Sequence, residues 1–185
     1  MEKNIYNDIE RVLLSEQEIA EICRRLGKQI TEDYKDKKLL IVSVLKGSFI
    51  FMADLVRNID LPCRVDFMAV SSYGKGTSSS GNVKIVKDLD LDLSGYDILV
   101  VEDILDSGVT LSYLKSLLLT RGPKSFKICT FLDKPSRRIA KEIVADYVGA
   151  EVPDAFVVGY GLDYDEEYRN VRFLGALKSS VYENK

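Results

Sequence analysis

Two adjacent carboxylates and a turn of small residues follow an apolar run in the middle of this 185-residue chain. Residues 98–101 are apolar, and the groups that follow are Glu102, Asp103 and the turn Asp106-Ser107-Gly108-Val109-Thr110. If a helix starts at this turn, its free amides and its dipole favour a bound phosphate. The carboxylates would repel that phosphate unless they face sugar hydroxyls or a Mg²⁺ ion carried by the ligand. The pattern thus suits a phosphorylated ribose, although an ordinary strand-to-helix loop with solvated acids is the simpler alternative.

The residues on either side of this segment predict a buried strand before it and a helix after it. Four apolar residues in a row suit a strand that is covered on both faces. Between Thr110 and Thr120 leucines recur at helical spacing, and Gly122-Pro123 should end the helix. The two acids are therefore expected at the tip of a strand, and the turn at the start of a helix.

The rest of the chain predicts an alternation of strands and helices. Ser15-Glu16-Gln17-Glu18 is a capping box, so an amphipathic helix should run to about Ile30. A second helix should follow Lys46-Gly47-Ser48 and reach about Asn58. Strands are predicted at 39–45, 64–70, 83–86, 126–132 and 156–158, with a loop at 71–82. This order predicts an α/β fold with a mostly parallel sheet, and the absence of a linker predicts a single domain over 1–185.

The composition excludes several classes of chemistry. The chain has no histidine, so a Ser-His-Asp triad is impossible and proton transfer must use carboxylates, lysine, tyrosine or water. A net charge of −3 gives no overall basic character that would indicate a nucleic-acid binder, although a local basic patch of Lys134, Arg137, Arg138 and Lys141 stays open as an alternative. Cys23, Cys63 and Cys129 are widely spaced in apolar surroundings, which predicts buried free thiols in a reducing compartment. Neither a secretory signal nor an apolar run of about 18 residues is present, so no membrane span is expected.

The stretch from Val100 to Thr110 resembles the phosphoribosyl-pyrophosphate (PRPP) motif of type I phosphoribosyltransferases. It differs from a Walker A loop and from a dinucleotide-binding fingerprint, neither of which occurs in the chain. From roughly Leu39 to Arg172 the chain is similar to the 6-oxopurine branch of that family. The resemblance implies the type I phosphoribosyltransferase fold, with a mostly parallel central sheet flanked by helices and a small hood.

The resemblance also implies roles for the groups that would hold PRPP. Glu102 and Asp103 would bind the ribose hydroxyls, and the turn from Asp106 to Thr110 would bind the 5′-phosphate. Asp106 would also serve as the acid–base partner of the purine N7, or would only stabilise charge there. Lys46, Gly47 and Arg169 would bind pyrophosphate, and the Lys46–Gly47 peptide can be cis in this family. For the Lys46-Gly47 segment, a simple helix start is the plain alternative.

A purine site is implied by two further segments. Lys134 would donate to the exocyclic O6 of the base, and an ammonium group favours a 6-oxo base because it donates and never accepts. Phe156 would stack on the purine ring, Val157 would offer backbone groups to its edge, and Asp163 would lie on the Mg²⁺ side. The metal set would then be Glu102, Asp103 and Asp163. A solvated strand end for Lys134 and a core role for Phe156 are the structural alternatives.

The loop from Ser71 to Gly81 is rich in glycine and serine, a composition typical of flexible segments. Ser72 and Tyr73 match a family dipeptide in a loop that closes over the reaction centre as a lid. A hairpin tip without any catalytic role is the alternative.

The resemblance as a whole implies an enzyme of purine salvage in the cytoplasm. It would transfer ribose 5-phosphate from PRPP to N9 of hypoxanthine or guanine, with Mg²⁺, to give IMP or GMP and pyrophosphate. A homodimer or homotetramer is expected, without membrane or nucleic-acid partners. Two alternatives remain open at this point: an enzyme that prefers xanthine, and a non-catalytic PRPP-sensing regulator that binds nucleic acid.

Overall fold

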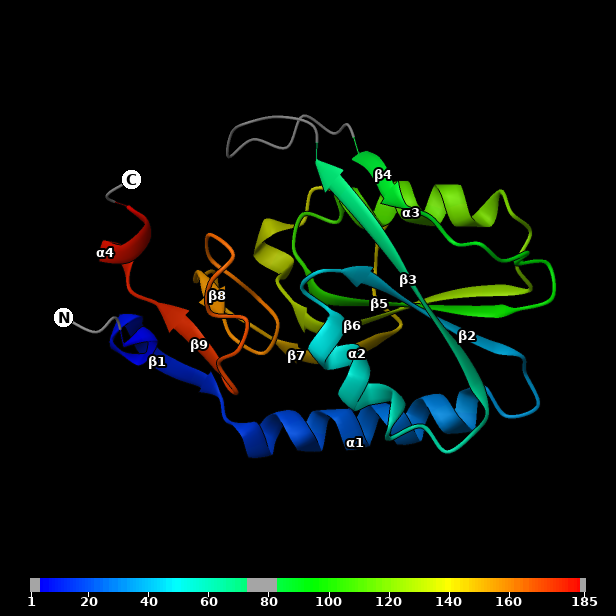
Figure 1. Cartoon of the computed structure of the whole chain (residues 1–185). Coiled ribbons are helices and arrows are strands. Elements are labelled where there is room, and N and C mark those ends of the chain that lie inside the picture. The colour runs from blue at the N-terminus through cyan, green and yellow to red at the C-terminus, as the bar shows by residue number, and fades with distance from the viewer. Residues whose placement is uncertain (1–3, 73–82, 184–185) are drawn as a thin grey trace.

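A six-stranded sheet of order β4-β3-β2-β5-β6-β7 forms the centre of the protein (Figure 1). The structure is a computed structural model that describes residues 4–72 and 83–183. All neighbouring strands of this sheet are parallel except β4, which pairs antiparallel with β3. Its strands are β2 (Leu39–Leu45), β3 (Cys63–Ser72), β4 (Val83–Lys87), β5 (Asp97–Leu105), β6 (Ser125–Asp133) and β7 (Tyr147–Glu151). The predicted mostly parallel sheet is confirmed.

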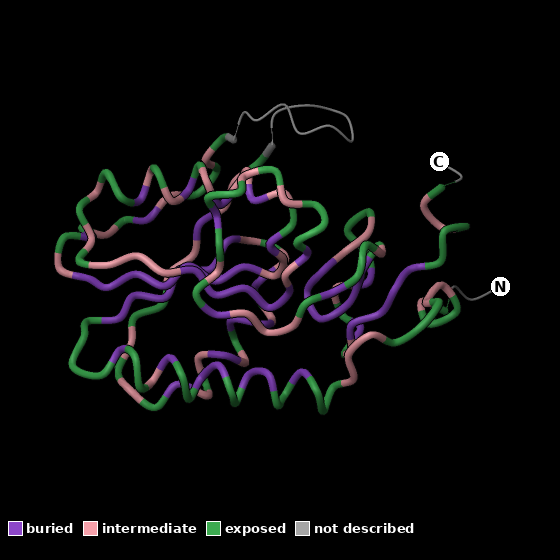
Figure 2. The backbone as a smooth tube through the Cα atoms, turned by 180° about the vertical axis from the view of Figure 1, so that it is seen from behind, coloured by how far each residue is buried: buried purple, intermediate pink, exposed green. Residues whose placement is uncertain are grey.

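Helices cover both faces of the sheet, which explains why its central strands read as continuous apolar runs. One face packs against α1 (Glu16–Asp33) and α2 (Phe49–Val56), and the other packs against α3 (Val109–Leu119). Along β5 the side chains alternate between these two layers: Val101 joins the cluster of α1 and α2, whereas Val100 joins the leucines of α3. The core therefore forms two apolar layers, one on each face of the sheet, and the strands between them are largely buried (Figure 2).

A second, three-stranded antiparallel sheet lies beside the carboxyl edge of the central sheet and forms the hood (Figure 1). Its order is β1-β9-β8, so it joins the beginning and the end of the chain. Its strands are β1 (Ile9–Leu14), β8 (Val157–Val158) and β9 (Leu174–Leu177), and the short helix α4 (Ser179–Tyr182) follows. The expected small hood is confirmed, although the sequence had not predicted β1 or β9.

Some predicted boundaries need correction. β5 extends to Leu105, so Glu102 and Asp103 lie inside a strand and not at a tip beyond it. Helix α2 ends at Val56, before Asn58, while β3 begins one residue earlier than predicted and extends to Ser72. Cys63 is only partly buried, whereas Cys23 and Cys129 are buried free thiols as expected. Within the described residues, no helix combines the length and apolarity needed to cross a membrane.

The predicted capping box at the start of α1 is present and gives a test of local stability. The Glu18 amide donates to Ser15 Oγ at 3.3 Å, and the Ser15 amide donates to Glu18 Oε2 at 2.8 Å. We expect Ser15→Ala to lower the free energy of unfolding by about 1 kcal/mol, measured by urea denaturation, because the Glu18 amide loses its acceptor at the helix start. Ser116→Ala is the matched control, since that hydroxyl only bonds the Ser112 carbonyl one turn back within α3. Equal losses in both variants would contradict the role of the cap.

Candidate active site

The turn between β5 and α3 presents a cradle of backbone amides. Gly108 caps α3 in the left-handed region, with φ at 79°, where glycine is favoured. In the part of the chain that the structure describes, the Ser107 and Gly108 amides have no acceptor, while the Val109 amide donates to Ser107 Oγ at 3.4 Å. Thr110 lies in the first turn of α3, whose amides also lack helical partners. Donors thus converge where the sequence predicted a phosphate site.

The two acids of β5 lie at the same edge but on opposite faces of the strand, as alternation requires. Glu102 is buried, and burial raises its pKa well above the usual range, with a further rise from the charge of Asp103. Burial also raises the pKa of Asp103 to about 6, although Arg169 opposes the rise. Both carboxylates would therefore be stabilised in their charged form by a ligand that brings hydroxyl donors or a cation.

The segment after β2 lies directly against one of these acids. A Cβ on Gly47 would overlap the Asp103 carboxylate, and a Cβ on Gly161 would overlap the Gly47 carbonyl. Only glycine fits at both positions. The cis peptide is Leu45–Lys46, which corrects the expected position at Lys46–Gly47. Gly161 was missed because its contact with Gly47 spans more than a hundred residues of sequence.

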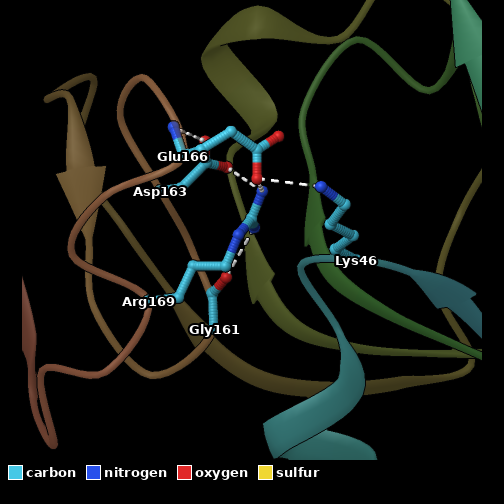
Figure 3. Close-up of polar contacts among 5 residues, drawn as sticks. All are labelled: Lys46, Gly161, Asp163, Glu166 and Arg169. Atoms are coloured by element: carbon cyan, nitrogen blue, oxygen red, sulfur yellow. Dashed lines mark hydrogen bonds and ion pairs between the residues drawn. The ribbon is translucent and has the colours of Figure 1, made fainter.

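Lys46 and Arg169, the two cations expected to bind pyrophosphate, are joined by one acidic side chain (Figure 3). Glu166 Oε2 lies 3.0 Å from Lys46 Nζ and 3.3 Å from Arg169 Nη2. Arg169 also contacts Asp163 Oδ1 at 2.8 Å and donates to the Gly161 carbonyl at 2.8 Å. Its Nε is buried without a hydrogen-bond partner among the described residues. Glu166 was missed, because it stands in an acidic run with nothing to single it out.

Lys134 is buried at the end of β6, which rules out the alternative of a solvated strand end. Its side chain is 9% exposed, and its Nζ donates to the Ala155 carbonyl at 2.8 Å. Its backbone amide donates to the Leu105 carbonyl at 3.0 Å, next to the amide cradle. Because Ala155 directly precedes Phe156, the predicted purine residues from β6 and the hood do come together.

Phe156 lies just before β8 with 39% of its surface exposed, so it is not a core residue. Its ring stacks on Tyr182 of α4, with centroids 5.1 Å apart and an interplanar angle of 25°. Tyr164 contacts it edge-on at 5.3 Å. Val157 is buried and pairs with Ala176 in the hood. The two tyrosines were missed, since only the fold brings them to Phe156.

The expected metal residues do not form a metal site from protein groups alone. Across residues 4–72 and 83–183 there is no group of three acidic, cysteine or histidine side chains suited to a metal ion, so Glu102, Asp103 and Asp163 are not gathered around one point. Asp103 and Asp163 still lie close enough for their charges to interact. Mg²⁺ commonly takes one or two carboxylates and completes its shell with substrate oxygens and water. The residues therefore fit a metal ion that arrives with a phosphorylated ligand.

Asp106 is exposed at the mouth of the turn, next to the cradle. Ser72 is the last residue of β3, and its backbone pairs with Val83 of β4. Tyr73 and the rest of the predicted lid, up to residue 81, lie outside the described residues.

Comparisons with known proteins agree with this geometry. Residues 12–165 match the phosphoribosyl transferase domain family. The hypoxanthine-guanine phosphoribosyltransferase of Bacillus subtilis is 58% identical over 96% of this chain and 98% of its own length. A hypoxanthine phosphoribosyltransferase structure from Staphylococcus aureus matches with a TM-score of 0.95 at 50% identity, covering 100% of both chains. A Trypanosoma cruzi enzyme of that name gives 0.91 at 42% identity, over 98% and 97% of the two chains. The chain therefore belongs to the phosphoribosyltransferase family, in its hypoxanthine-guanine branch.

Proposed function

We propose that this chain transfers ribose 5-phosphate from PRPP to N9 of hypoxanthine or guanine and releases pyrophosphate. The observation that carries the proposal is the meeting of three groups at one edge of the sheet: the amide cradle of α3, the buried Lys134 and the cluster around Arg169. Each group matches one part of the two substrates. The names of the relatives, at 51–58% identity, favour hypoxanthine and guanine over xanthine and favour an enzyme over a regulator.

The cradle and the acids of β5 account for binding of the ribose phosphate. The Ser107 and Gly108 amides and the Thr110 hydroxyl bind the 5′-phosphate, and Glu102 and Asp103 accept hydrogen bonds from the ribose hydroxyls. Lys46 and Arg169 bind the pyrophosphate, and a cavity of about 600 Å³ lies against both of them. A forked guanidinium suits two phosphate oxygens at once.

The purine side rests on one donor and one aromatic face. Lys134 Nζ donates to the O6 of the base, which accepts, whereas a 6-amino group would face it with a second donor. Phe156 stacks on the ring, and the Val157 backbone meets its edge. Asp106 holds or moves the proton at N7 as N9 attacks the anomeric carbon with inversion. The Ser72-Tyr73 lid excludes water, which would otherwise hydrolyse PRPP.

Mg²⁺ is the cofactor that we propose for the reaction. Asp103 and Asp163 would hold it together with substrate oxygens, and bound there it would neutralise charge on the leaving group. The remaining steps depend on the chain's own side chains and amides.

We further propose a single catalytic domain that works in the cytoplasm as a homodimer or homotetramer. Phe49, on the first turn of α2, is 41% exposed and lines the same cavity as Lys46 and Phe67. An apolar side chain beside a ligand cavity would be covered if a second subunit packed on this face. In the related Trypanosoma cruzi enzyme, the C-terminal region has been examined for a role in oligomeric state.

Turnover tests the proposal directly. The purified protein should convert hypoxanthine and PRPP to IMP only when a divalent cation is present, followed by ultraviolet absorbance. Adenine should be a poor substrate, because an unpaired buried donor costs about 1–3 kcal/mol. Absence of turnover with every 6-oxopurine in the presence of Mg²⁺ would contradict the proposed enzymatic activity. Adenine turnover equal to that of hypoxanthine would contradict the proposed role of Lys134.

Truncation of Asp106 and truncation of Thr110 should change different kinetic constants. Asp106→Ala should lower kcat by roughly 10²–10⁴-fold, the usual contribution of a general acid or base, with a smaller change in KM for PRPP. Thr110→Ala should mainly raise KM, because it removes a hydroxyl donor to the 5′-phosphate. Steady-state kinetics with both variants would show the reverse pattern if the two roles were misassigned.

Glu166 should act as an internal competitor of pyrophosphate, because it bonds both Lys46 and Arg169. We expect Glu166→Gln to tighten PRPP binding by about two- to five-fold, the range that an exposed ion pair supports. Isothermal titration of PRPP measures this effect. Glu167→Gln removes the same charge one position along the chain. An equal gain in that control would show a long-range effect of charge and would exclude direct competition.

A further inference from the structure

A short segment behind the phosphate cradle holds its backbone in place. Residues 138–140, called here the brace, follow β6 and the turn that begins at Lys134. The Ile139 and Ala140 amides both donate to the Ser107 carbonyl, each at 2.9 Å. The brace therefore binds the cradle from the side of its carbonyl groups.

Arg138 extends this contact to the two preceding carbonyls. Its Nε donates to the Asp106 carbonyl at 2.9 Å, and its Nη2 donates to the Leu105 carbonyl at 3.1 Å. Nη1 donates to the Ile143 carbonyl at 2.8 Å, and Nη2 also pairs with the Asp133 carboxylate. Every guanidinium nitrogen thus has an acceptor, and the side chain is only 13% exposed. A lysine could not reproduce this planar set of donors.

The direction of these carbonyls determines the direction of the cradle amides. A trans peptide unit is planar, so the N–H of each residue points opposite to the carbonyl of the residue before it. Because the Asp106 and Ser107 carbonyls point into the brace, the Ser107 and Gly108 amides point away from it, into the candidate phosphate site. Van der Waals contact adds to this constraint: a Cβ on Gly108 would come within 3.2 Å of Arg138 Cδ.

The same guanidinium also links the two halves of the site. The Leu105 carbonyl accepts from Arg138 and from the Lys134 amide, and the Asp133 partner of Arg138 directly precedes Lys134. Arg138 lies behind both and need not touch either substrate.

We propose that Arg138 is a positioning residue that orients the amides of the 5′-phosphate cradle before the substrate binds. The inference rests on the proposed function, because it assumes that the cradle holds the phosphate of PRPP and of IMP. It predicts that loss of Arg138 reduces the share of binding that comes from the phosphate and leaves binding of the nucleoside part largely unchanged.

The test compares IMP with inosine, which has the same base and ribose but lacks the phosphate. Isothermal titration, with displacement for the weaker ligand, gives the ratio of the two dissociation constants for each folded variant. Arg138→Met should reduce the preference for IMP by about 10-fold, equivalent to about 1.4 kcal/mol. Arg138→Lys should reduce the preference for IMP by an intermediate factor. It supplies the same comparison if Arg138→Met does not fold.

Arg121→Met is the matched control for the loss of a paired arginine. Arg121 binds Asp88 through two hydrogen bonds of 2.8 and 2.7 Å just beyond the end of α3, away from the cradle. The Arg121→Met variant should keep the full preference for IMP over inosine, even if its melting temperature falls. An unchanged preference for IMP in both Arg138 variants would overturn the positioning role of Arg138. An equal loss of that preference in the Arg121 control would overturn it as well. Wild-type protein that binds IMP no better than inosine would instead contradict the proposed function itself.

Discussion

Parallel pairing of β5 with β2 on one side and β6 on the other fixes where every candidate ligand group lies. Val101 is in register with Ser43 of β2 and with Cys129 of β6, so the three strands reach the same edge of the sheet. The first residues after these strands are Lys46, Asp106 and Lys134, respectively. Because carboxyl ends of parallel strands mark the binding edge of open α/β sheets, this register alone places the proposed pyrophosphate, ribose and purine contacts together.

The arginines at this edge of the sheet are paired with acids, whereas two acids of β5 have no cation beside them in a salt bridge among the described residues. Arg169 is neutralised by Asp163 and Glu166, and Arg138 is neutralised by Asp133. Glu102, which is buried, and Asp103, which is partly buried, are in contrast acids whose pKa values are raised. A substrate with hydroxyls, phosphates and an accompanying cation would satisfy the acids and could replace Glu166 at the cations. Substrate binding would then complete an electrostatic arrangement that the protein leaves unfinished.

Local sequence predicted the features that depend on neighbouring residues, and it could not predict those that depend on distant contacts. The amide cradle, the capping box of α1 and the buried strands follow from spacing and propensity within a dozen residues. The hood pairs Ile9 with Leu177, and Gly161 meets Gly47, so neither contact has a local signal. The positioning role of Arg138 was missed for a similar reason: it is one of several basic residues after β6 and is distinguished only by the carbonyls of a turn some thirty residues earlier.

The central claim is that the start of α3 is the 5′-phosphate site and that the buried lysine faces the base. A crystal structure of the protein with IMP tests this claim most directly. The account predicts the phosphate on the amides of residues 107–110, the ribose hydroxyls toward Glu102 and Asp103, and O6 of the base within hydrogen-bond distance of Lys134 Nζ. A phosphate bound at the Arg169 cluster, or a base away from Lys134 and Phe156, would contradict it.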